Sequence, residues 1–285
     1  MRILITHCAS FGRPIARHLA AAGHKVDLER ANADGRPDAV VLAVSTTGDL
    51  EHARRLGRTF PNAPILALAR IALPEVAAVE ALPITLMFPG WSDTRRSRPL
   101  GLPGSVVGPL SGPPRAADRR LVALLRSAGI RAALRGNLQA WLTVTSAWLS
   151  PFRGAVVAAA QRGLTLDATP DLITLAARAA RERLHLLQRA QFPLPPVCSC
   201  LLHLSESWAI AIVRSIASAL RAAPDMQCIP GCEEAALVAG RLKVLAREGG
   251  IRTPAADFLD GFAREEAART NERGSGDGAE PGVWK

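Results

Sequence analysis

Two adjacent carboxylates are the first side chains in this sequence whose type and placement suit chemistry. Glu233 and Glu234 lie at the start of a helical stretch near the C-terminus. Neighbouring helix residues point about 100° apart, so only one of the two can face a given substrate. A carboxylate that is withdrawn from water gains a higher pKa and can exchange protons near neutral pH. Glu234 is therefore a catalytic candidate; the alternative is a solvated glutamate that balances the positive end of the helix dipole.

A second set of candidates lies in the turn after the first predicted strand, where α/β sheets present ligands. A dinucleotide-binding turn needs three glycines, but His7 and Ala9 take the first two positions and only Gly12 remains. Their side chains would crowd a pyrophosphate, so we favour a turn that no longer holds a nucleotide, with His7 contacting whatever molecule replaces it. If a dinucleotide still binds, Gly12, Ala9 and Arg30 are the residues that would contact it, Arg30 near the 2′-phosphate.

Polar and aromatic residues near position 205 form a third set. His203 and Glu206 share a face if one helix contains both, whereas Ser205 points elsewhere, so these three cannot form a nucleophile relay. We expect His203 and Glu206 to bind substrate, with Trp141 and Trp208 as apolar walls.

The five cysteines indicate neither a metal site nor a disulfide framework. Cys198 and Cys200 are separated by one residue, and Cys228 and Cys232 by three, whereas zinc knuckles use two. We predict no metal and ordinary buried thiols. No run of 18 apolar residues and no signal peptide is visible, so we predict a cytoplasmic protein without a membrane partner.

Composition indicates a folded chain and argues against a nucleic-acid partner. The 285 residues suffice for two domains, and 48% hydrophobic with 21% charged residues supports a sizeable core. The net charge is +10. However, aromatic residues make up only 4%, without any Tyr, which leaves few platforms for stacking bases.

Hydrophobic periodicity divides the chain into two parts. The first part alternates predicted strands with helices, which is typical of a doubly wound α/β sheet. Its strands are predicted at 2–6, 24–29, 38–44, 63–69, 84–88 and 105–107, and its helices at 14–22, 50–59 and 116–128. The second part is predicted to be helical, with helices at 138–149, 152–162, 169–192, 199–223 and 233–249. Residues 265–285 show no apolar face and are predicted to be disordered.

The order of these features resembles the ketopantoate reductase family of NADPH-dependent enzymes. The matching text includes MRILITHCASFG, PDAVVLAV, VVGPLSG, LVALLRSAGI and GCEEAALVAGRLKVLAREGGIRTP, and covers residues 1–264. The resemblance implies a Rossmann-like domain over 1–137 and an all-helical domain over 138–264, the architecture shared with 6-phosphogluconate dehydrogenase. It also implies a homodimer formed through the helical domain.

The family's site residues carry over unevenly. Its catalytic glutamate falls on Glu234, or on Glu233 if the register differs by one. Its Trp-x-Lys-Leu-x-x-Asn motif begins at Trp141, which places Thr143 where the family has its catalytic Lys and Ala147 where it has a substrate-binding Asn. Thr143 is kept as a substrate-binding candidate, but a hydroxyl cannot protonate a ketone at neutral pH as an ammonium does.

These substitutions favour a member that has lost its original reaction. We predict that no cofactor is used and that the chain acts on a small, largely apolar organic substrate in the interdomain cleft. The predicted chemistry is isomerisation or cyclisation, possible in a biosynthetic setting, with Glu234 or His7 moving a proton. Two alternatives stay open: an NADP(H)-dependent carbonyl reductase with an atypical nucleotide loop, and a non-catalytic binding or scaffold protein.

Overall fold

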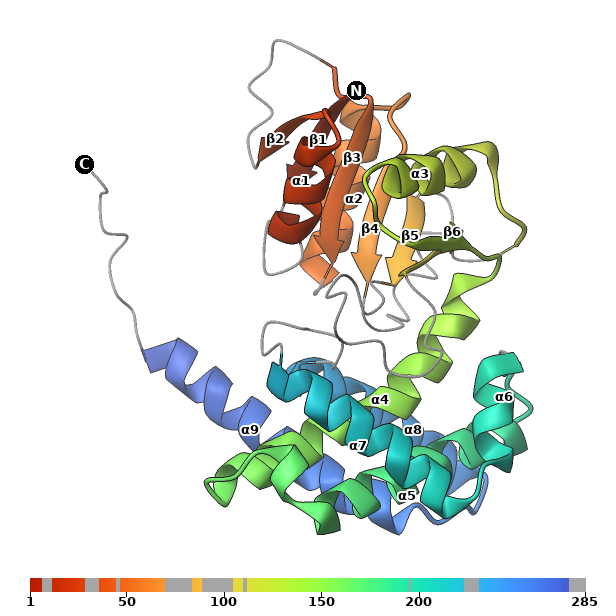
Figure 1. Cartoon of the computed structure of the whole chain (residues 1–285), viewed down its shortest axis with the longest axis vertical. Helices are drawn as coiled ribbons and strands as arrows, with labels where there is room; N and C mark the ends of the chain where they lie inside the picture. Colours follow the sequence, from red (N-terminus) through yellow and green to blue (C-terminus); the bar gives the residue numbers. More distant parts are fainter. Residues whose placement is uncertain are drawn as a thin grey trace. The chain divides into compact units, whose positions relative to one another are not determined.

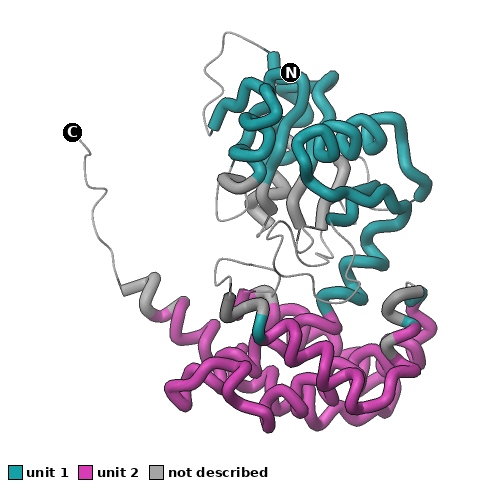
Figure 2. The backbone as a smooth tube through the Cα atoms, viewed as in Figure 1, with its two compact units in different colours: residues 1–146, 193–199, 218–228 teal, residues 147–192, 200–217, 229–285 magenta. Residues whose placement is uncertain are grey.

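The chain forms two compact units (Figure 2). The computed structural model describes residues 1–6, 12–28, 36–44, 47–69, 84–88, 105–109, 112–194, 196–222 and 231–276. The sheet unit consists of residues 1–146, 193–199 and 218–228, and the helical unit consists of residues 147–192, 200–217 and 229–285.

The sheet unit contains a seven-stranded sheet in the order β2-β1-β3-β4-β5-β6-β7 (Figure 1). Its strands are β1 (Arg2–Thr6), β2 (Lys25–Leu28), β3 (Ala39–Val44), β4 (Ile65–Ala69), β5 (Ile84–Phe88), β6 (Ser105–Pro109) and β7 (Ala132–Leu134). The β5–β6 pair is antiparallel and every other pair is parallel. The predicted parallel sheet is confirmed, and β7 is a strand that sequence periodicity missed.

Helices cover both faces of this sheet. Alternate β1 residues, Ile3 and Ile5, share a buried core with side chains of α1 (Gly12–Ala21) and α3 (Ala116–Ser127). Because side chains alternate along a strand, Leu4 points to the opposite face. On that face α2 (Thr47–Thr59) lies against β3 and β4. Burial on both faces explains why the strand sequences are almost continuously apolar.

The other regular structure in the described part of the chain is helical, which confirms the predicted fold class. The helices are α4 (Leu138–Gln161), α5 (Pro170–Arg189), α6 (Pro196–His203), α7 (Glu206–Ala222), α8 (Cys232–Glu248) and α9 (Pro254–Gly276). A single 3₁₀ turn, Leu166–Ala168, joins α4 to α5. None of the described helices is long and apolar enough to cross a membrane.

The helix α4 continues through Pro151, where the sequence predicted two helices. Proline lacks the N–H that would bond the carbonyl four residues earlier, which belongs to Ala147. The hydroxyl of Ser150 donates to that carbonyl instead, at 3.4 Å. The predicted break at this proline was wrong, and the Ser150 hydroxyl partly compensates for the missing backbone donor.

The opposite error occurs at Ser205. A single helix over 199–223 was predicted, but α6 ends at His203 and α7 begins at Glu206. The Ser205 side chain accepts a hydrogen bond from the Trp208 N–H at 3.4 Å, and its carbonyl accepts from the Ala209 N–H at 3.1 Å. Ser205 therefore caps a new helix, which is a common role for serine.

The helix α9 extends to Gly276, so the predicted disorder from residue 265 was wrong for residues 265–276. Its buried side is made of small residues, since Ala263 is 1% exposed and Ala267 is 7% exposed. The exposed side carries Arg269, which forms ion pairs with Glu265 and Glu266. Alanine is only weakly hydrophobic, so the buried side of α9 did not show a recognisable apolar pattern in the sequence. Residues 277–285 lie outside the described part of the chain.

A buried ion pair joins three helices of the helical unit. Arg183 of α5 is 2% exposed; it donates to the carboxylate of Asp260 on α9, and to the Ser150 hydroxyl of α4 at 2.8 Å. Burial raises the pKa of Asp260, and the Arg183 guanidinium opposes that rise. The adjacent Glu182 accepts from the Ala256 N–H at 3.0 Å and so caps α9. Polar contacts thereby fix α4, α5 and α9 together.

A glycine lets α4 and α9 approach closely. A Cβ at Gly154 of α4 would overlap the carbonyl oxygen of Leu259 on α9. A Cβ at Gly261 of α9, by contrast, would meet no atom of the described chain within 4 Å.

We expect Arg183→Met to destabilise the protein by about 3–5 kcal/mol, because it leaves the buried Asp260 carboxylate unpaired. The double variant R183M/D260L should lose clearly less stability, because it leaves no unpaired charge. In R183M the folded-state pKa of Asp260 rises further, so the folded state binds more protons than the unfolded state. The loss of unfolding free energy should therefore become smaller as the pH falls. Urea unfolding of the full chain at several pH values measures this; equal losses in the single and double variants would contradict it.

We also expect Gly154→Ala to cost about 1–3 kcal/mol through overpacking. The matched control Gly261→Ala should be neutral or stabilising by up to about 1 kcal/mol, since it adds a helix-favouring side chain in open space. Unfolding midpoints of the two variants provide the measurement. If both variants were stabilised, the α4–α9 contact described above would be wrong.

Candidate functional site

Trp141 contributes a buried polar atom to the candidate site. It lies in the first turn of α4 and is half-buried. Its indole nitrogen is buried, and the described residues provide no acceptor for its N–H. Leaving a buried donor unpaired costs about 1–3 kcal/mol and is rare in folded proteins, so such a group invites an acceptor from outside the chain.

Thr143 already uses its hydroxyl within the helix. Its Oγ1 donates to the carbonyl of Gln139 at 2.9 Å. Two residues along a helix turn the side chain by about 200°, so Thr143 and Trp141 occupy different faces of α4. Ala147, the second position of interest in this motif, is 0% exposed. This stretch of α4 therefore offers neither an ammonium nor an amide where the resemblance would require them.

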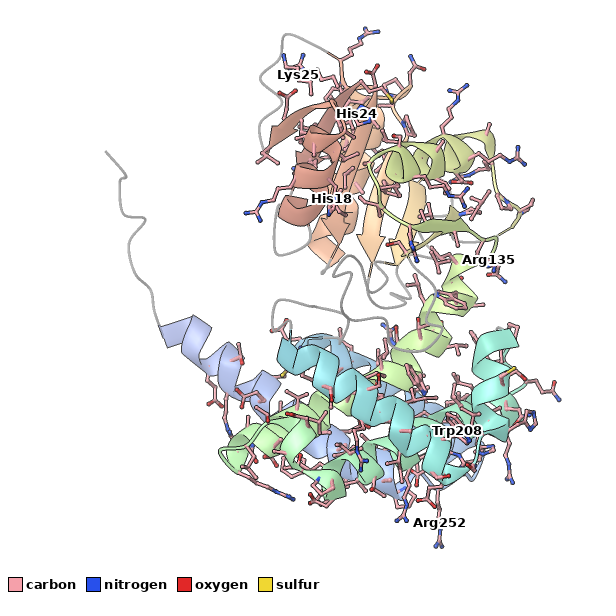
Figure 3. The ribbon with its side chains drawn as sticks, viewed as in Figure 1. His18, His24, Lys25, Arg135, Trp208 and Arg252 are labelled. Carbon is pink, nitrogen blue, oxygen red and sulfur yellow. The ribbon has the colours of Figure 1, made fainter. Side chains whose placement is uncertain are left out.

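His203, Glu206 and Trp208 do not form the predicted group on one helix. His203 ends α6 and Glu206 starts α7, so the expected i, i+3 relation within a helix was wrong. Both side chains are exposed, and Glu206 accepts from the Arg178 Nε at 2.6 Å. Trp208, in the first turn of α7 (Figure 3), is 58% exposed.

Several predicted site residues have positions that the structure describes only partly. Glu234 is the third residue of α8, near the positive end of the helix dipole, and the structure describes only its backbone. Its neighbour Glu233 is exposed. Gly12 is the first residue of α1. His7, Ala9 and Arg30 lie outside the described residues, so their roles stay predictions.

The end of β1 holds a residue that the sequence reasoning missed. Thr6 is 6% exposed, and its hydroxyl has no hydrogen-bond partner in the described chain. It is the last residue of the strand, at the edge where α/β sheets bind ligands. Thr6 follows the apolar run Ile3–Ile5, and a polar residue in that position is the sequence signal that could have identified it.

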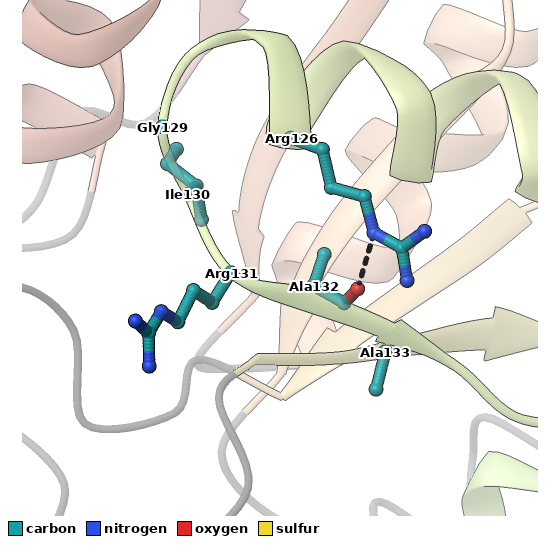
Figure 4. Close-up of a pocket in the computed structure, with 6 residues that line it drawn as sticks. All are labelled: Arg126, Gly129, Ile130, Arg131, Ala132 and Ala133. Carbon is teal, nitrogen blue, oxygen red and sulfur yellow. Dashed lines mark hydrogen bonds between the residues drawn. The ribbon is translucent and has the colours of Figure 1, made fainter.

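The two described thiols and the cavity in Figure 4 add no further functional group to the candidate site. Cys200 is exposed, and burial raises the pKa of the half-buried Cys232 thiol. No cluster of three metal-ligating side chains occurs among the described residues. Figure 4 shows a cavity of about 400 Å³ that contains none of the predicted site residues. It is lined by Arg126, Gly129, Ile130, Arg131, Ala132 and Ala133, and the Arg126 Nε donates to the Ala132 carbonyl at 2.9 Å.

Neither a protein-family model nor a curated protein matches the chain. Solved structures do match it. The 2-dehydropantoate 2-reductase of Methylococcus capsulatus superposes with a TM-score of 0.64 at 17% identity, over 95% of this chain and 98% of that chain. A putative ketopantoate reductase of Ralstonia solanacearum MolK2 gives 0.63 at 15% identity, over 95% and 98%. The chain has the ketopantoate reductase fold.

A third match widens the range of chemistry found on this fold. D-mandelate dehydrogenase, in a ternary complex with NADH and anilino(oxo)acetate, superposes with a TM-score of 0.63 at 13% identity, over 95% of this chain and all 100% of that chain. At such identities the likeness is one of fold alone. The resemblance drawn from the sequence is confirmed at that level, across both units of the ketopantoate reductase fold.

The unpaired indole of Trp141 is directly measurable. Its N–H resonance, identified among the five tryptophans by its loss in Trp141→Phe, should lie upfield of the Trp208 resonance and exchange with solvent more slowly. The exposed Trp208 bonds water and provides the internal reference. Coincident shifts and equal exchange rates would show that the Trp141 N–H is already hydrogen-bonded.

Proposed function

We propose that this protein uses the ketopantoate reductase fold for a reaction other than NADPH-dependent reduction, namely isomerisation or cyclisation of a small, largely apolar organic molecule. The observation that carries this proposal is the Thr143 hydroxyl, which donates to the Gln139 carbonyl. A ketone reduction needs an acid at the carbonyl oxygen as well as a hydride donor. Thr143 is not such an acid, and its hydrogen is already engaged.

The chemistry that remains is proton movement without a change in oxidation state. The Glu234 carboxylate removes a proton from a substrate carbon next to a carbonyl and returns it to another atom of the same molecule. The C–H electron pair moves into the substrate's π system and then forms the new bond, so atoms and electrons balance without a co-reactant. His7 is the second candidate for this proton transfer.

The buried indole N–H of Trp141 is a second group that suits a carbonyl-bearing substrate. As charge builds up on the substrate oxygen, a buried N–H without a competing acceptor stabilises it more than a solvated donor would. Half-burial of the indole also provides an apolar surface for the rest of the substrate. The substrate class that fits is therefore an apolar molecule with one carbonyl or carboxylate oxygen.

Thr143 and Ala147 fit a nicotinamide-dependent ketone reduction poorly, because neither can donate a proton to the carbonyl oxygen. The D-mandelate dehydrogenase match, whose structure contains NADH, is the observation that favours the alternative of an NADP(H)-dependent carbonyl reductase. That alternative needs a proton donor that α4 does not supply at Thr143 or Ala147. A non-catalytic scaffold is the third possibility, and the same experiment distinguishes it from both enzymes.

The decisive test compares the masses of substrate and product. The purified protein is incubated with a small-molecule extract of its source cells, with and without NADPH, followed by chromatography and mass spectrometry. We expect one compound to convert to another of identical mass and different retention time, independently of NADPH. Glu234→Gln should abolish this conversion, whereas the adjacent control Glu233→Gln should retain it.

Other outcomes of this experiment contradict the proposal. A product heavier by two hydrogens that forms only with NADPH identifies a reductase. Conversion that is equal in E234Q and wild type removes Glu234 from the mechanism. No conversion under any condition, for a protein that is folded by circular dichroism, indicates a scaffold.

A further inference from the structure

The cavity beside the edge strand β7 has the size of a small-molecule site (Figure 4). It lies within the sheet unit, where α3 ends and β7 begins. Its two polar side chains are those of Arg126 and Arg131, and its other described lining residues are glycine, alanine and isoleucine. No acidic side chain lines it among the described residues. Two cationic side chains with an otherwise apolar lining suit an organic anion.

One hydrogen bond within the chain orients the Arg126 guanidinium. Its Nε donates to the Ala132 carbonyl at 2.9 Å, which ties the end of α3 to β7. No described residue accepts a hydrogen bond from either of its terminal nitrogens. These two nitrogens can therefore donate to both oxygens of one carboxylate, and the bond at Nε fixes the plane in which that carboxylate binds.

The backbone beside the cavity favours a carboxylate over a phosphate. Phosphate sites in proteins usually draw on free backbone N–H groups, above all at the start of a helix. Here the cavity adjoins the end of α3, and the N–H groups are engaged. Gly129 donates its N–H to the Arg126 carbonyl at 3.0 Å, and Ile130 donates its N–H to the Leu125 carbonyl at 2.9 Å. Arginine side chains are therefore the donors that remain, and a guanidinium matches the two oxygens of a carboxylate.

Arg131 gives the cavity a second cation. It is exposed, and its side chain forms no hydrogen bond or ion pair with a described residue. In Figure 4 it points away from Arg126, so one small anion does not bridge the two side chains. A ligand that uses both arginines carries an acidic group at each end. Ile130, Ala132 and Ala133 line the same cavity and suit a hydrocarbon middle.

The charge of this part of the chain also favours an anion. Between residues 115 and 135 the sequence has six arginines and a single acid, Asp118, which pairs with Arg115 at 3.0 Å. The other five arginines are exposed and form no ion pair with a described acid: Arg119, Arg120, Arg126, Arg131 and Arg135. Such an excess of one charge raises the local concentration of anions and speeds their binding.

We propose that the cavity at β7 binds a small organic dicarboxylate, with one carboxylate on Arg126 and the other on Arg131. None of the predicted site residues lines this cavity, so it is a binding site in addition to the candidate functional site. The proposal does not depend on which reaction the protein catalyses. A ligand held in this way connects α3 with β7 and stabilises the folded sheet unit by mass action.

Isothermal titration calorimetry of the full chain at low ionic strength tests the ligand class. The probes are succinate, glutarate and adipate, with acetate and inorganic phosphate for comparison. We expect at least one dicarboxylate to bind about tenfold or more tightly than acetate and phosphate, because only a dicarboxylate contacts both arginines. Absence of binding by every dicarboxylate overturns the proposal. Acetate or phosphate that binds as tightly as the best dicarboxylate overturns it as well.

Substitutions test the two contacts. Arg126→Gln and Arg131→Gln should each weaken the best dicarboxylate about tenfold, and Arg126→Lys should weaken it as much, since an ammonium cannot bind a carboxylate in the same two-point geometry. The matched control Arg120→Gln removes the same charge from an exposed position of α3 outside the cavity and should stay within a few-fold of wild type. Circular dichroism checks that each variant is folded.

The variant at Arg131 keeps the test sound if the loss of the Arg126–Ala132 bond lowers stability, because Arg131 forms no such bond. Equal losses in R120Q, R126Q and R131Q would show general attraction to a basic surface and contradict the proposed site. Wild-type affinity in R126K would contradict the two-point contact at Arg126.

Discussion

Three hydroxyl side chains of α4 donate hydrogen bonds to carbonyls of the same helix, and the interpretation of the site depends on one of these bonds. Thr143 donates to Gln139, Thr145 donates to Trp141, and Ser150 donates to Ala147. The last of these bonds gives the Ala147 carbonyl a donor that Pro151 cannot supply. The first engages the hydroxyl of Thr143, the position that the sequence resemblance matches to the family's catalytic lysine.

The polar groups that stabilise this helical unit are separate from those that suit chemistry. Arg183, Asp260 and Ser150 form a buried set whose members bond one another, so they fix α4, α5 and α9 without an outside ligand. Trp141 and Thr6 instead each hold a buried polar atom that lacks a partner in the described chain. Buried atoms of the second kind mark where a ligand would improve the hydrogen bonding. The fold can therefore persist while its reaction changes.

Sequence reasoning succeeded where one residue type determines the local structure. The strands β1 and β5 were predicted with their observed bounds, since short and mainly apolar runs are typical of strands in a parallel sheet. It failed where the hydrogen bond of a single side chain matters more than the hydrophobic pattern. Ser150 donates to the carbonyl that Pro151 leaves without a donor, and Ser205 caps the start of α7.

The candidate site was predictable only through the resemblance. The spacing of residues along α4 identified Thr143 and Ala147, but the engaged hydroxyl and the unpaired indole depend on three-dimensional packing that no pattern encodes. The most direct test of the central claim uses NADPH that carries deuterium at C4 of the nicotinamide, added during conversion of the native substrate. We expect a product without deuterium; a product that has gained one deuterium from the cofactor would contradict a reaction that does not use NADPH.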